Sequence, residues 1–417
     1  MIPSDRETLR TLASQLVEIS VDDVQEERRA GWRASNGLRP HRPMIWITEI
    51  PWDECREHHD ELRPACEGGS ERQIELELRR RLFTQRHLQC DDVEDGIWWV
   101  QKEFDFADWG LDVAEELIQQ GDSYVRSHKY LAVIKNPDDI EQIQMPAVSY
   151  DHERTQKSVC VAEEAFGDIM PMRVCGPRQH YFAAWDRLVK WTGVTQALLD
   201  LIDRPDFIHG IMRRMTDVYI ARMKQYEDQG LLDDSNHLNR VGSGAAGWTD
   251  QLPTEREGGL HLADQWGGSA AQILGDVSPE MHQEFALQYE IQVMEQCGLN
   301  YYGCCEPVHQ KMHILAKVPR LRKLSISPWC DTSKAADRAE GCYVFSHKPT
   351  PAIFAYDQFD IEAAEQELRR RLENSRGMSC EIIMKDISTV RGRIDRVEQW
   401  TEMAMRVAHD HVCSPQN

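Results

Sequence analysis

The sequence predicts an α/β protein built as a single (β/α)8 barrel with a helical extension at its N-terminus. Apolar, β-rich runs alternate with amphipathic helical patterns at intervals of roughly 25 to 45 residues, which is typical of a parallel sheet. No Gly/Ser-rich or Pro-rich linker divides the 417 residues into separate units. About eight strand–helix units in a chain of this length favour a closed barrel over an open sheet.

Composition and charge exclude several classes of function. Acidic residues outnumber basic ones by 70 to 48, and the formal net charge of −22 repels nucleic acids and anionic membrane surfaces. We therefore expect neither a nucleic acid nor a membrane as a partner. The chain has no apolar run as long as the ~18 residues that a membrane-spanning helix needs. Its first residues also lack a secretory signal, so we expect a cytoplasmic protein.

Twelve cysteines are scattered along the chain without a CxxC pair, so the sequence supports neither a zinc ribbon nor a thioredoxin-like motif. In the cytoplasm these cysteines stay mostly as thiols. Most of them are expected to act as small buried hydrophobic residues.

Residues 1–40 are expected to form the helical extension, and residues 41–410 the barrel. Two polar helical patterns fill the extension, "DRETLRTLASQLVEI" and "VDDVQEERRAGWRASNG". A strand follows in "RPMIWITEI", then a helix over 70–88 with Ser70 as its N-cap, and a second strand in "GIWWVQKEF". The segment "NPDDIEQIQMP" is expected to be a small subdomain or a barrel insertion.

From residue 174 onward the alternation becomes sharper. The helix in "SPEMHQEFALQYEIQVMEQCG" is well marked, with Ser278 as its cap, Pro279 in the first turn and Gly298 just past its end. The other helices expected here are "AAWDRLVKWTG", "VTQALLDLIDRPDFIHGIMRRMTDVYIARMKQYEDQG", "EPVHQKMHILAKVP", "SKAADRAEG", "IEAAEQELRRRLENSRG" and "RIDRVEQWTEMAMRVAHDH". The strands expected are "RVCGP", "HLNRVGSGAAG", "GLHLADQWGGSAAQIL", "LNYYGCC", "RKLSISPW", "YVFSHKP" and "CEIIMKDI".

The segment "GSGAAG", residues 242–247, has the letters of the GxGxxG dinucleotide-binding fingerprint. It does not open an amphipathic helix, and no acidic residue ends a second strand beyond it. We therefore interpret it as a barrel loop rather than as a nucleotide site.

In a parallel barrel the active site lies at the carboxyl ends of the strands, so residues just past each strand converge at one mouth. Cys380 begins its strand and is expected at the opposite face. The residues expected at the mouth are Cys304, Cys305 and Glu306 after "LNYYG", Trp329, Cys330 and Asp331 after "LSIS", Lys385 and Asp386 after "EIIM", and Asp264, Gln265 and Trp266 at "LHLADQ".

Reactive side chains are densest in "NYYGCCEPVH", residues 300–309. Neighbouring residues of a strand point to opposite sides, so Cys304 and Glu306 would share a direction and Cys305 would face away, unless the strand has ended. Thiolate, imidazole and carboxylate donors suit zinc, and a catalytic zinc site keeps one position open. The zinc ligands expected from this cluster are Cys304, Cys305, Glu306, His309 and Cys330.

Simpler structural roles stay open for the same residues. Either cysteine alone is more often a packed thiol than a ligand. His309 lies in the next expected helix and could merely cap it, while Lys385 and Asp386 could form a structural ion pair. Trp329 is expected in a wall of the substrate pocket rather than in catalysis.

The segments "RPMIWITEIPWDE", "SPEMHQEFALQYE", "YYGCCEPVH", "RKLSISPWCD" and "EIIMKDISTVRG" share a resemblance to one known family. They resemble uroporphyrinogen decarboxylase-like proteins, in particular the branch that includes cobalamin- and coenzyme M-linked methyltransferases. The resemblance runs over residues 40–410 and implies a (β/α)8 barrel, in agreement with the strand–helix alternation.

The decarboxylase branch of that family takes a porphyrinogen with many carboxylates and grips it with an arginine-bearing stretch just after the first strand. Here the same place reads "ITEIPWDE", with acidic side chains at Glu49, Asp53 and Glu54. This departure disfavours the decarboxylase reaction, because the acids would repel an octa-anionic ligand.

The methyltransferase branch binds zinc through a His-x-Cys pair at one strand end and a further cysteine on a later strand. Tyr302 stands in the place of the histidine, and Cys304 in that of its cysteine. The last strand offers Asp386 instead of a cysteine. The resemblance thus implies an altered ligand set at the same position in the barrel.

The leading hypothesis is a corrinoid-dependent methyltransferase component that activates a small methylated substrate with zinc. The methyl group would pass to a separate corrinoid protein, since the chain lacks the D-x-H-x-x-G signature for cobalamin. A bacterial, cytoplasmic protein is expected, and a homodimer is compatible with it. The residues expected to act in catalysis are Glu306, Lys385 and Asp386, and those expected to bind substrate are Tyr302, Gln265, Trp266, Trp329 and Asp331.

Two alternatives stay open. A cofactor-free lyase of the same fold could decarboxylate a smaller acid held by arginines such as Arg173 and Arg178, and zinc would then be irrelevant. A non-catalytic protein could instead bind a corrinoid or another tetrapyrrole, with thiols that are only structural. The metal content of the purified protein would separate the zinc enzyme from the other two.

We predict that the protein does not decarboxylate uroporphyrinogen. Such a ligand needs guanidinium groups that pair with its carboxylates, and Glu49, Asp53 and Glu54 occupy their place. Incubation with uroporphyrinogen should give no coproporphyrinogen above the spontaneous background, measured by porphyrin fluorescence after oxidation. Product formation by native protein that heat-denatured protein does not show would contradict this prediction.

Overall fold

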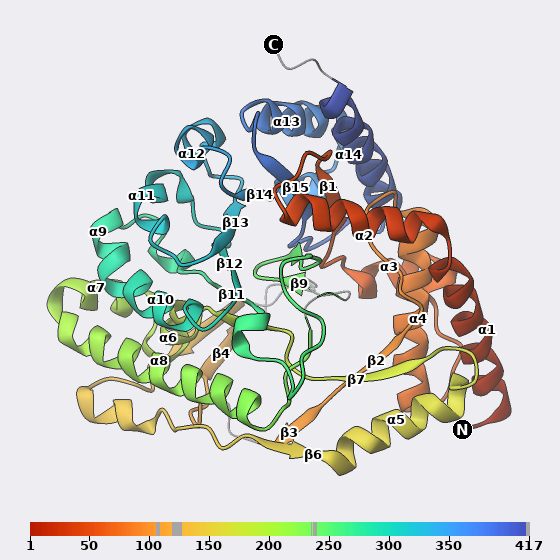
Figure 1. Ribbon diagram of the computed structural model, residues 1–417, viewed down its shortest axis with the longest axis horizontal. Coiled ribbons are helices and arrows are strands. Elements are labelled where there is room, and N and C mark those ends of the chain that lie inside the picture. Colours follow the sequence, from red (N-terminus) through yellow and green to blue (C-terminus); the bar gives the residue numbers. More distant parts are fainter. Residues whose placement is uncertain (106–108, 119–126, 235, 237–239, 414–417) are drawn as a thin grey trace.

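The computed structural model describes residues 1–105, 109–118, 127–234, 236 and 240–413. A seven-stranded parallel sheet lies at the centre with helices around it, so the protein has the α/β architecture that the sequence predicts (Figure 1). The first strand of the sheet pairs with the last. The spatial order is β1 (Met44–Ile47), β15 (Ser379–Met384), β14 (Val344–His347), β13 (Leu321–Ile326), β12 (Leu299–Tyr302), β11 (Trp266–Ser269) and β8 (Gln179–Phe182).

Helices separate most of these strands along the chain and surround the sheet (Figure 1). They are α1 (Pro3–Ser20), α2 (Asp23–Asn36), α3 (Trp52–His58), α4 (Gly69–His87), α5 (His152–Phe166), α6 (Ala184–Thr192), α7 (Val194–Asp203), α8 (Pro205–Asp228), α9 (Pro279–His282), α10 (Gln288–Met294), α11 (Met312–Leu315), α12 (Thr332–Ala339), α13 (Ile361–Glu373) and α14 (Asp395–Cys413). None of the helices in the described ranges is long and apolar enough to cross a membrane.

Four two-stranded sheets lie beside the main sheet. Their strand pairs are β2 (Trp98–Gln101) with β7 (Met172–Cys175), β3 (Glu103–Asp105) with β6 (Ser149–Asp151), β4 (Ala114–Ile118) with β5 (Ser127–Leu131), and β9 (Arg240–Val241) with β10 (Ala245–Ala246).

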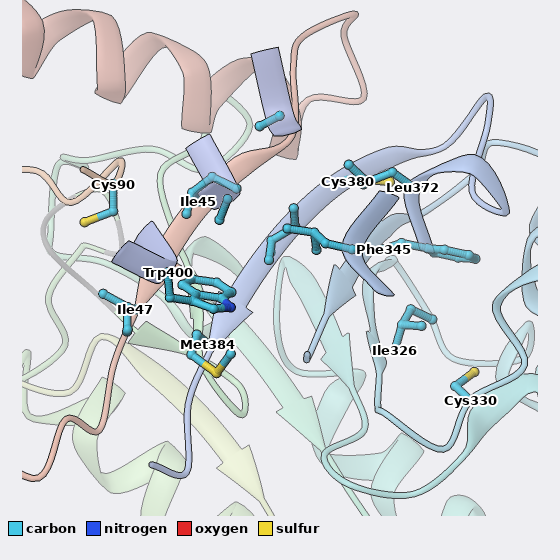
Figure 2. Packing of buried hydrophobic residues seen from close by; sticks show 14 of the residues in the cluster. Ile45, Ile47, Cys90, Ile326, Cys330, Phe345, Leu372, Cys380, Met384 and Trp400 are labelled. Carbon is cyan, nitrogen blue, oxygen red and sulfur yellow. The ribbon is translucent and has the colours of Figure 1, made fainter. Parts of the chain in front are cut away.

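The strands of the main sheet are buried on both faces. Successive side chains of a strand point to opposite faces, so one face can be apolar while the other is polar. In β13, Leu324 and Ile326 belong to the outer hydrophobic core, while Lys323 and Ser325, which alternate with them, make polar contacts on the inner face. Figure 2 shows the outer core around β1, β13, β14 and β15, with the indole of Trp400 from α14 packed against it.

The β9–β10 hairpin packs against the inner face of the sheet, near the centre of the molecule (Figure 1). Lys323 Nζ donates a hydrogen bond to the Ala246 carbonyl at 2.8 Å. Gly242 turns the hairpin with a φ of +59°, and a Cβ there would lie 2.2 Å from the ring of Tyr301. The segment "GSGAAG" is therefore a tight hairpin rather than a strand-to-helix turn that binds a dinucleotide.

Both helices expected in the N-terminal extension are present, as α1 and α2. The apolar side of α1, which includes Leu9 and Leu16, packs against α4 and α5. The end of α2 contacts the hairpin, because Asn36 Nδ2 donates to the carbonyls of Ala246 at 3.0 Å and Trp248 at 2.6 Å. The extension is thus fixed to the sheet, and a domain boundary at residue 40 stays a prediction.

Three expected elements differ from the structure. The strand expected in "GLHLADQ" begins only at Trp266, because residues 262–264 form a 3-10 turn that the Asp264 carboxylate closes. The helix expected in "EPVHQKMHILAKVP" is reduced to two short turns, Val308–Gln310 and Met312–Leu315. The strand expected in "GIWWVQKEF" is divided, and its β2 part pairs with β7. Seven strands make up the main sheet in the described ranges, and a closed eight-stranded barrel stays a prediction.

We predict that the buried ion pair of Lys323 with Glu381 is essential for stability. Nζ and Oε2 lie 2.7 Å apart, and both side chains are fully buried. Lys323→Met should lower the free energy of unfolding by about 3–5 kcal/mol, because Glu381 would keep a buried charge without a partner. The shift in the urea midpoint, followed by circular dichroism, measures this effect.

The double variant Lys323→Met/Glu381→Leu is the informative control, since it removes the uncompensated charge and should regain most of the loss. A second control is Lys129→Met, which breaks an exposed pair with Glu116 at 2.9 Å and should cost less than about 1 kcal/mol. A double variant as unstable as Lys323→Met would show that packing, not charge, determines the loss.

Candidate functional site

The turn after β12 brings two cysteines to the carboxyl end of the sheet. The strand ends at Tyr302, and Gly303 then turns the chain with a φ of +101°. A Cβ at Gly303 would lie 3.1 Å from the Cβ of Ser325 on the neighbouring strand, so glycine also allows the close approach of the two segments. Cys304 and Cys305 follow directly, at the strand end where the sequence predicts them.

The sulfurs of Cys304 and Cys305 lie 3.7 Å apart, and they contact each other in a thiol–thiol hydrogen bond. Cys304 is half-buried and Cys305 is exposed. If the strand continued, Cys305 would face away from Cys304. The chain has already left the strand at Gly303, so the alternation no longer applies and both thiols point to the same place.

Four hydrogen bonds hold the cysteine loop and the Glu306 side chain in place. Ser325 Oγ donates to the Cys304 carbonyl at 2.8 Å, and Tyr181 Oη donates to the Gly303 carbonyl at 3.2 Å. Glu306 is buried, and its Oε2 accepts from the Cys304 N–H at 2.8 Å. Its Oε1 accepts from the N–H of Ala271 at 3.2 Å. Glu306 therefore orients the loop through backbone amides, and burial raises the pKa of its carboxyl group.

Charged side chains surround Lys385, the first residue after β15, at the same end of the sheet. Lys385 Nζ lies 2.6 Å from Asp386 Oδ2 and 3.7 Å from Glu49 Oε2. Arg240 pairs with the other oxygen of Glu49. Glu49 and Asp386 both adopt positive φ angles, +56° and +58°, which non-glycine residues rarely adopt. Such backbone strain is typical of functional sites.

The two thiols and Lys385 have unequal affinities for protons. The hydrogen bond with Cys304 lowers the pKa of Cys305; burial opposes this effect and the Lys385 ammonium adds to it. The same hydrogen bond, together with burial, raises the pKa of Cys304. Burial lowers the pKa of Lys385, but the hydrogen bond to Asp386 and the nearby acidic groups more than offset it, so the pKa is raised. Cys305 is thus the more acidic thiol of the pair.

A chain of buried hydrogen bonds lies on the outer side of β12. Lys311 Nζ donates to His282 Nδ1 at 3.1 Å, His282 Nε2 meets Tyr302 Oη at 2.6 Å, and Tyr302 Oη donates to Glu290 Oε2 at 2.8 Å. Burial raises the pKa of Glu290 to about 8 and lowers that of His282 to about 3. Tyr302, which the sequence analysis assigned to substrate binding, therefore points away from the mouth.

Cys330 and His309 lie close to each other, on the outer side of the sheet. Cys330 belongs to the outer hydrophobic core, where Figure 2 shows it near Ile326. Its sulfur accepts a hydrogen bond from the backbone N–H of His309. The ring of His309 in turn accepts from the Asp331 N–H through Nδ1, at 3.1 Å. Both residues thus have structural contacts of their own, separate from the sulfur pair.

The remaining residues assigned to substrate binding lie in separate parts of the structure. Asp331 caps α12, and the side chain of Trp329 is 76 % exposed. Gln265 is buried and bonds to His180 Nε2 at 2.8 Å. Trp266 is the first residue of β11, so it and Gln265 lie at the amino end of that strand. Their expected position at the mouth was wrong, because the strand begins where the sequence analysis expected it to end.

The donor set fits a zinc ion only in part. Zinc with Zn–S bonds of about 2.3 Å places two tetrahedral sulfur ligands about 3.8 Å apart, and the sulfurs of Cys304 and Cys305 lie 3.7 Å apart. A catalytic zinc site takes about three ligands from the protein. Among the residues that the structure describes, no three His, Cys, Asp or Glu side chains are placed to share one metal ion. The five expected ligands therefore do not assemble, and we derive no chemistry from zinc.

Lys348 is a candidate residue that the sequence analysis missed. It is the first residue after β14, and its buried Nζ donates to Ser346 Oγ and, at 3.2 Å, to the Gly244 carbonyl. Burial lowers its pKa to about 7. Lys348 directly follows the strand "VFSH", and residues that follow the strands of a parallel barrel are expected at its mouth. The sequence could have identified Lys348 in this way, as it identified Lys385 after "EIIM".

Comparisons with known proteins agree with this fold. No family model and no curated protein matches the sequence. A solved structure, a methyltransferase from Methanosarcina mazei, superposes with a TM-score of 0.51 over 91 % of this chain and 98 % of that chain, at 11 % sequence identity. At this identity the likeness shows the fold alone: the two chains share an overall α/β fold.

We predict that Cys305 reacts with iodoacetamide faster than the other exposed cysteines at neutral pH. Its lowered pKa gives more thiolate at pH 7, and the thiolate is the nucleophile. Lys385→Met removes a cation that lowers this pKa, so alkylation should slow by roughly tenfold for each unit by which the pKa rises. Peptide mapping by mass spectrometry, with Cys342 as the exposed reference, measures both rates. Equal rates in wild type and Lys385→Met would contradict the role of Lys385.

Proposed function

We propose that the protein is a methyltransferase that takes a methyl group from a small methylated substrate at the mouth of the sheet. The observation that carries this proposal is the Cys304–Cys305 pair, with sulfurs 3.7 Å apart, close to the Lys385 cation in a methyltransferase-like fold. Transfer of a methyl group is favoured by a polarisable group, such as sulfur, next to the methyl carbon. It also needs a general acid that protonates the departing heteroatom. A thiolate and an ammonium can supply these two functions.

We further propose a closed (β/α)8 barrel of the uroporphyrinogen decarboxylase-like kind. The pairing of β1 with β15 supports closure, since a barrel requires the first and last strands to meet. The environment of Glu49 supports the methyltransferase branch over the decarboxylase branch. Glu49 occupies the end of β1 and binds Arg240, so this guanidinium is already paired with an acid of the protein.

In this proposal the methyl carbon passes from the substrate heteroatom to an acceptor that enters the mouth. An electron pair of the acceptor forms the new bond to carbon, the bond between carbon and heteroatom breaks with its electron pair on the heteroatom, and Lys385 supplies the proton that neutralises it. Asp386 and Glu49 orient the ammonium at 2.6 and 3.7 Å. The Cys305 thiolate lies at the surface of the site, where it can contact the substrate.

We propose that the acceptor is a corrinoid on a separate protein, as the resemblance in sequence implies. Zinc at the sulfur pair is a prediction from the sequence, and no step above depends on it. The decarboxylating lyase gains no support from the arginines that it would use. Arg178 stacks on Trp99 at 3.9 Å and directly precedes β8, at the amino end of the sheet.

Methyl transfer can be measured with reduced free cobalamin as the acceptor, by the absorbance of methylcobalamin. Methyl ethers, methylamines and methyl thioethers serve as a panel of donors, each with and without added zinc. We expect transfer from at least one class of donor. Cys305→Ala and Lys385→Met should each lower kcat/KM by about 100-fold, because each removes a group that contacts the reacting atoms.

Cys380→Ala is the matched control, since Cys380 is buried in the outer core at the amino end of β15 (Figure 2) and should not affect transfer. Elemental analysis of protein purified without chelator tests zinc separately, in wild type, Cys304→Ala and Cys305→Ala. The proposal is wrong if no donor class is used under either condition, or if both active-site variants retain the wild-type rate.

A further inference from the structure

The sulfur pair offers two ligands to one bridging atom. Cys304 and Cys305 are adjacent, reduced, and 3.7 Å apart between sulfurs, and one of them is exposed. A disulfide would require the sulfurs to approach to about 2.05 Å. An atom bound to both sulfurs closes a ring that is larger by one atom and needs little movement. The loop is also held by Glu306 and Ser325, so the pair is ordered before any ligand arrives.

The number of donors decides which soft ligand fits. A structural or catalytic metal ion takes about three or four ligands from a protein. Two are present here, and no third His, Cys, Asp or Glu is placed to join them within the described ranges. A trivalent arsenic atom that already carries one carbon substituent needs only two further bonds. It is thiophilic and therefore prefers sulfur to oxygen or nitrogen ligands.

We propose that the Cys304–Cys305 pair binds monosubstituted trivalent arsenic compounds, R–As(OH)2, as a two-sulfur chelate. Two As–O bonds break and two As–S bonds form, and each thiol proton leaves with a hydroxide as water. Arsenic stays trivalent throughout, so no oxidant or reductant is needed. This inference rests on the proposed function and names a class of substrate for the same site, which includes methylated arsenic compounds.

The surroundings of the pair suit such a ligand. The exposed Cys305 lets it enter, and the ammonium of Lys385 acts electrostatically on Cys305 from the same end of the sheet. The other cysteines described at the surface, Cys160 and Cys342, lie far apart in sequence and have no thiol partner in hydrogen-bonding contact. Among the cysteines that the structure describes, this pair is therefore the place where a chelate should form.

Phenylarsine oxide tests the proposal on the full-length reduced protein. We expect one adduct per chain by intact mass spectrometry, with two thiols lost from a colorimetric titration. The adduct should survive excess 2-mercaptoethanol and be removed by dithiothreitol. Cys304→Ser and Cys305→Ser should each weaken binding on the order of 100-fold, since the second bond no longer forms within the molecule. Cys342→Ser is the control and should bind like wild type.

Peptide mapping of the adduct and circular dichroism of each variant complete the test. The proposal is overturned if wild type loses the arsenical to 2-mercaptoethanol, if folded Cys304→Ser or Cys305→Ser retains full affinity, or if the adduct maps elsewhere. The assay contains no methyl acceptor, so its outcome is independent of methyl transfer. An adduct without transfer would refute the methyltransferase proposal alone, and transfer without an adduct would refute the arsenical proposal alone.

Discussion

The ion pair between Lys323 and Glu381 links the segments that build the inner face of the sheet. Lys323 comes from β13, Glu381 comes from β15, and the same ammonium binds the Ala246 carbonyl of the central hairpin. A buried charge is tolerated only when it is paired and hydrogen-bonded, so these three segments have little freedom to move independently. This constraint holds β13 and β15 in register with the central hairpin, on the face of the sheet from which Ser325 contacts the cysteine loop.

Hydrogen bonds to the backbone hold the cysteine loop in place. No group of three metal-binding side chains is found among the described residues. Gly303 turns the chain, and Glu306 then binds the Cys304 amide from within the protein. The carboxylate is thus already used in orienting the loop, and the sulfurs are left as the accessible donors. Lys385 adds a cation from the end of β15, which lies three strands away from β12 in the sheet. The chemistry available is that of a thiol of lowered pKa and an ammonium at the same end of the sheet.

Much of this arrangement could be predicted from the sequence, because it depends on local patterns. Alternating strand and helix signals predict a parallel α/β sheet, and Ser278 caps its helix as expected, accepting from the Met281 N–H at 3.2 Å. The rule that active sites follow strand ends places Cys304, Cys305 and Lys385 at one end of the sheet. These inferences need only the spacing of the hydrophobic residues and the residue at which each strand ends.

Tertiary structure alone decided which of those residues are available for chemistry. Glu306 binds the amide of Ala271, 35 residues away, and Cys330 is buried in the outer core. Trp266 begins its strand, and Lys348 is buried beside the hairpin. The sequence by itself determined the fold class and the position of the cysteine pair. Packing determined the partners of each polar group, because a hydrogen bond depends on distant segments meeting, and local periodicity carries no information about such contacts.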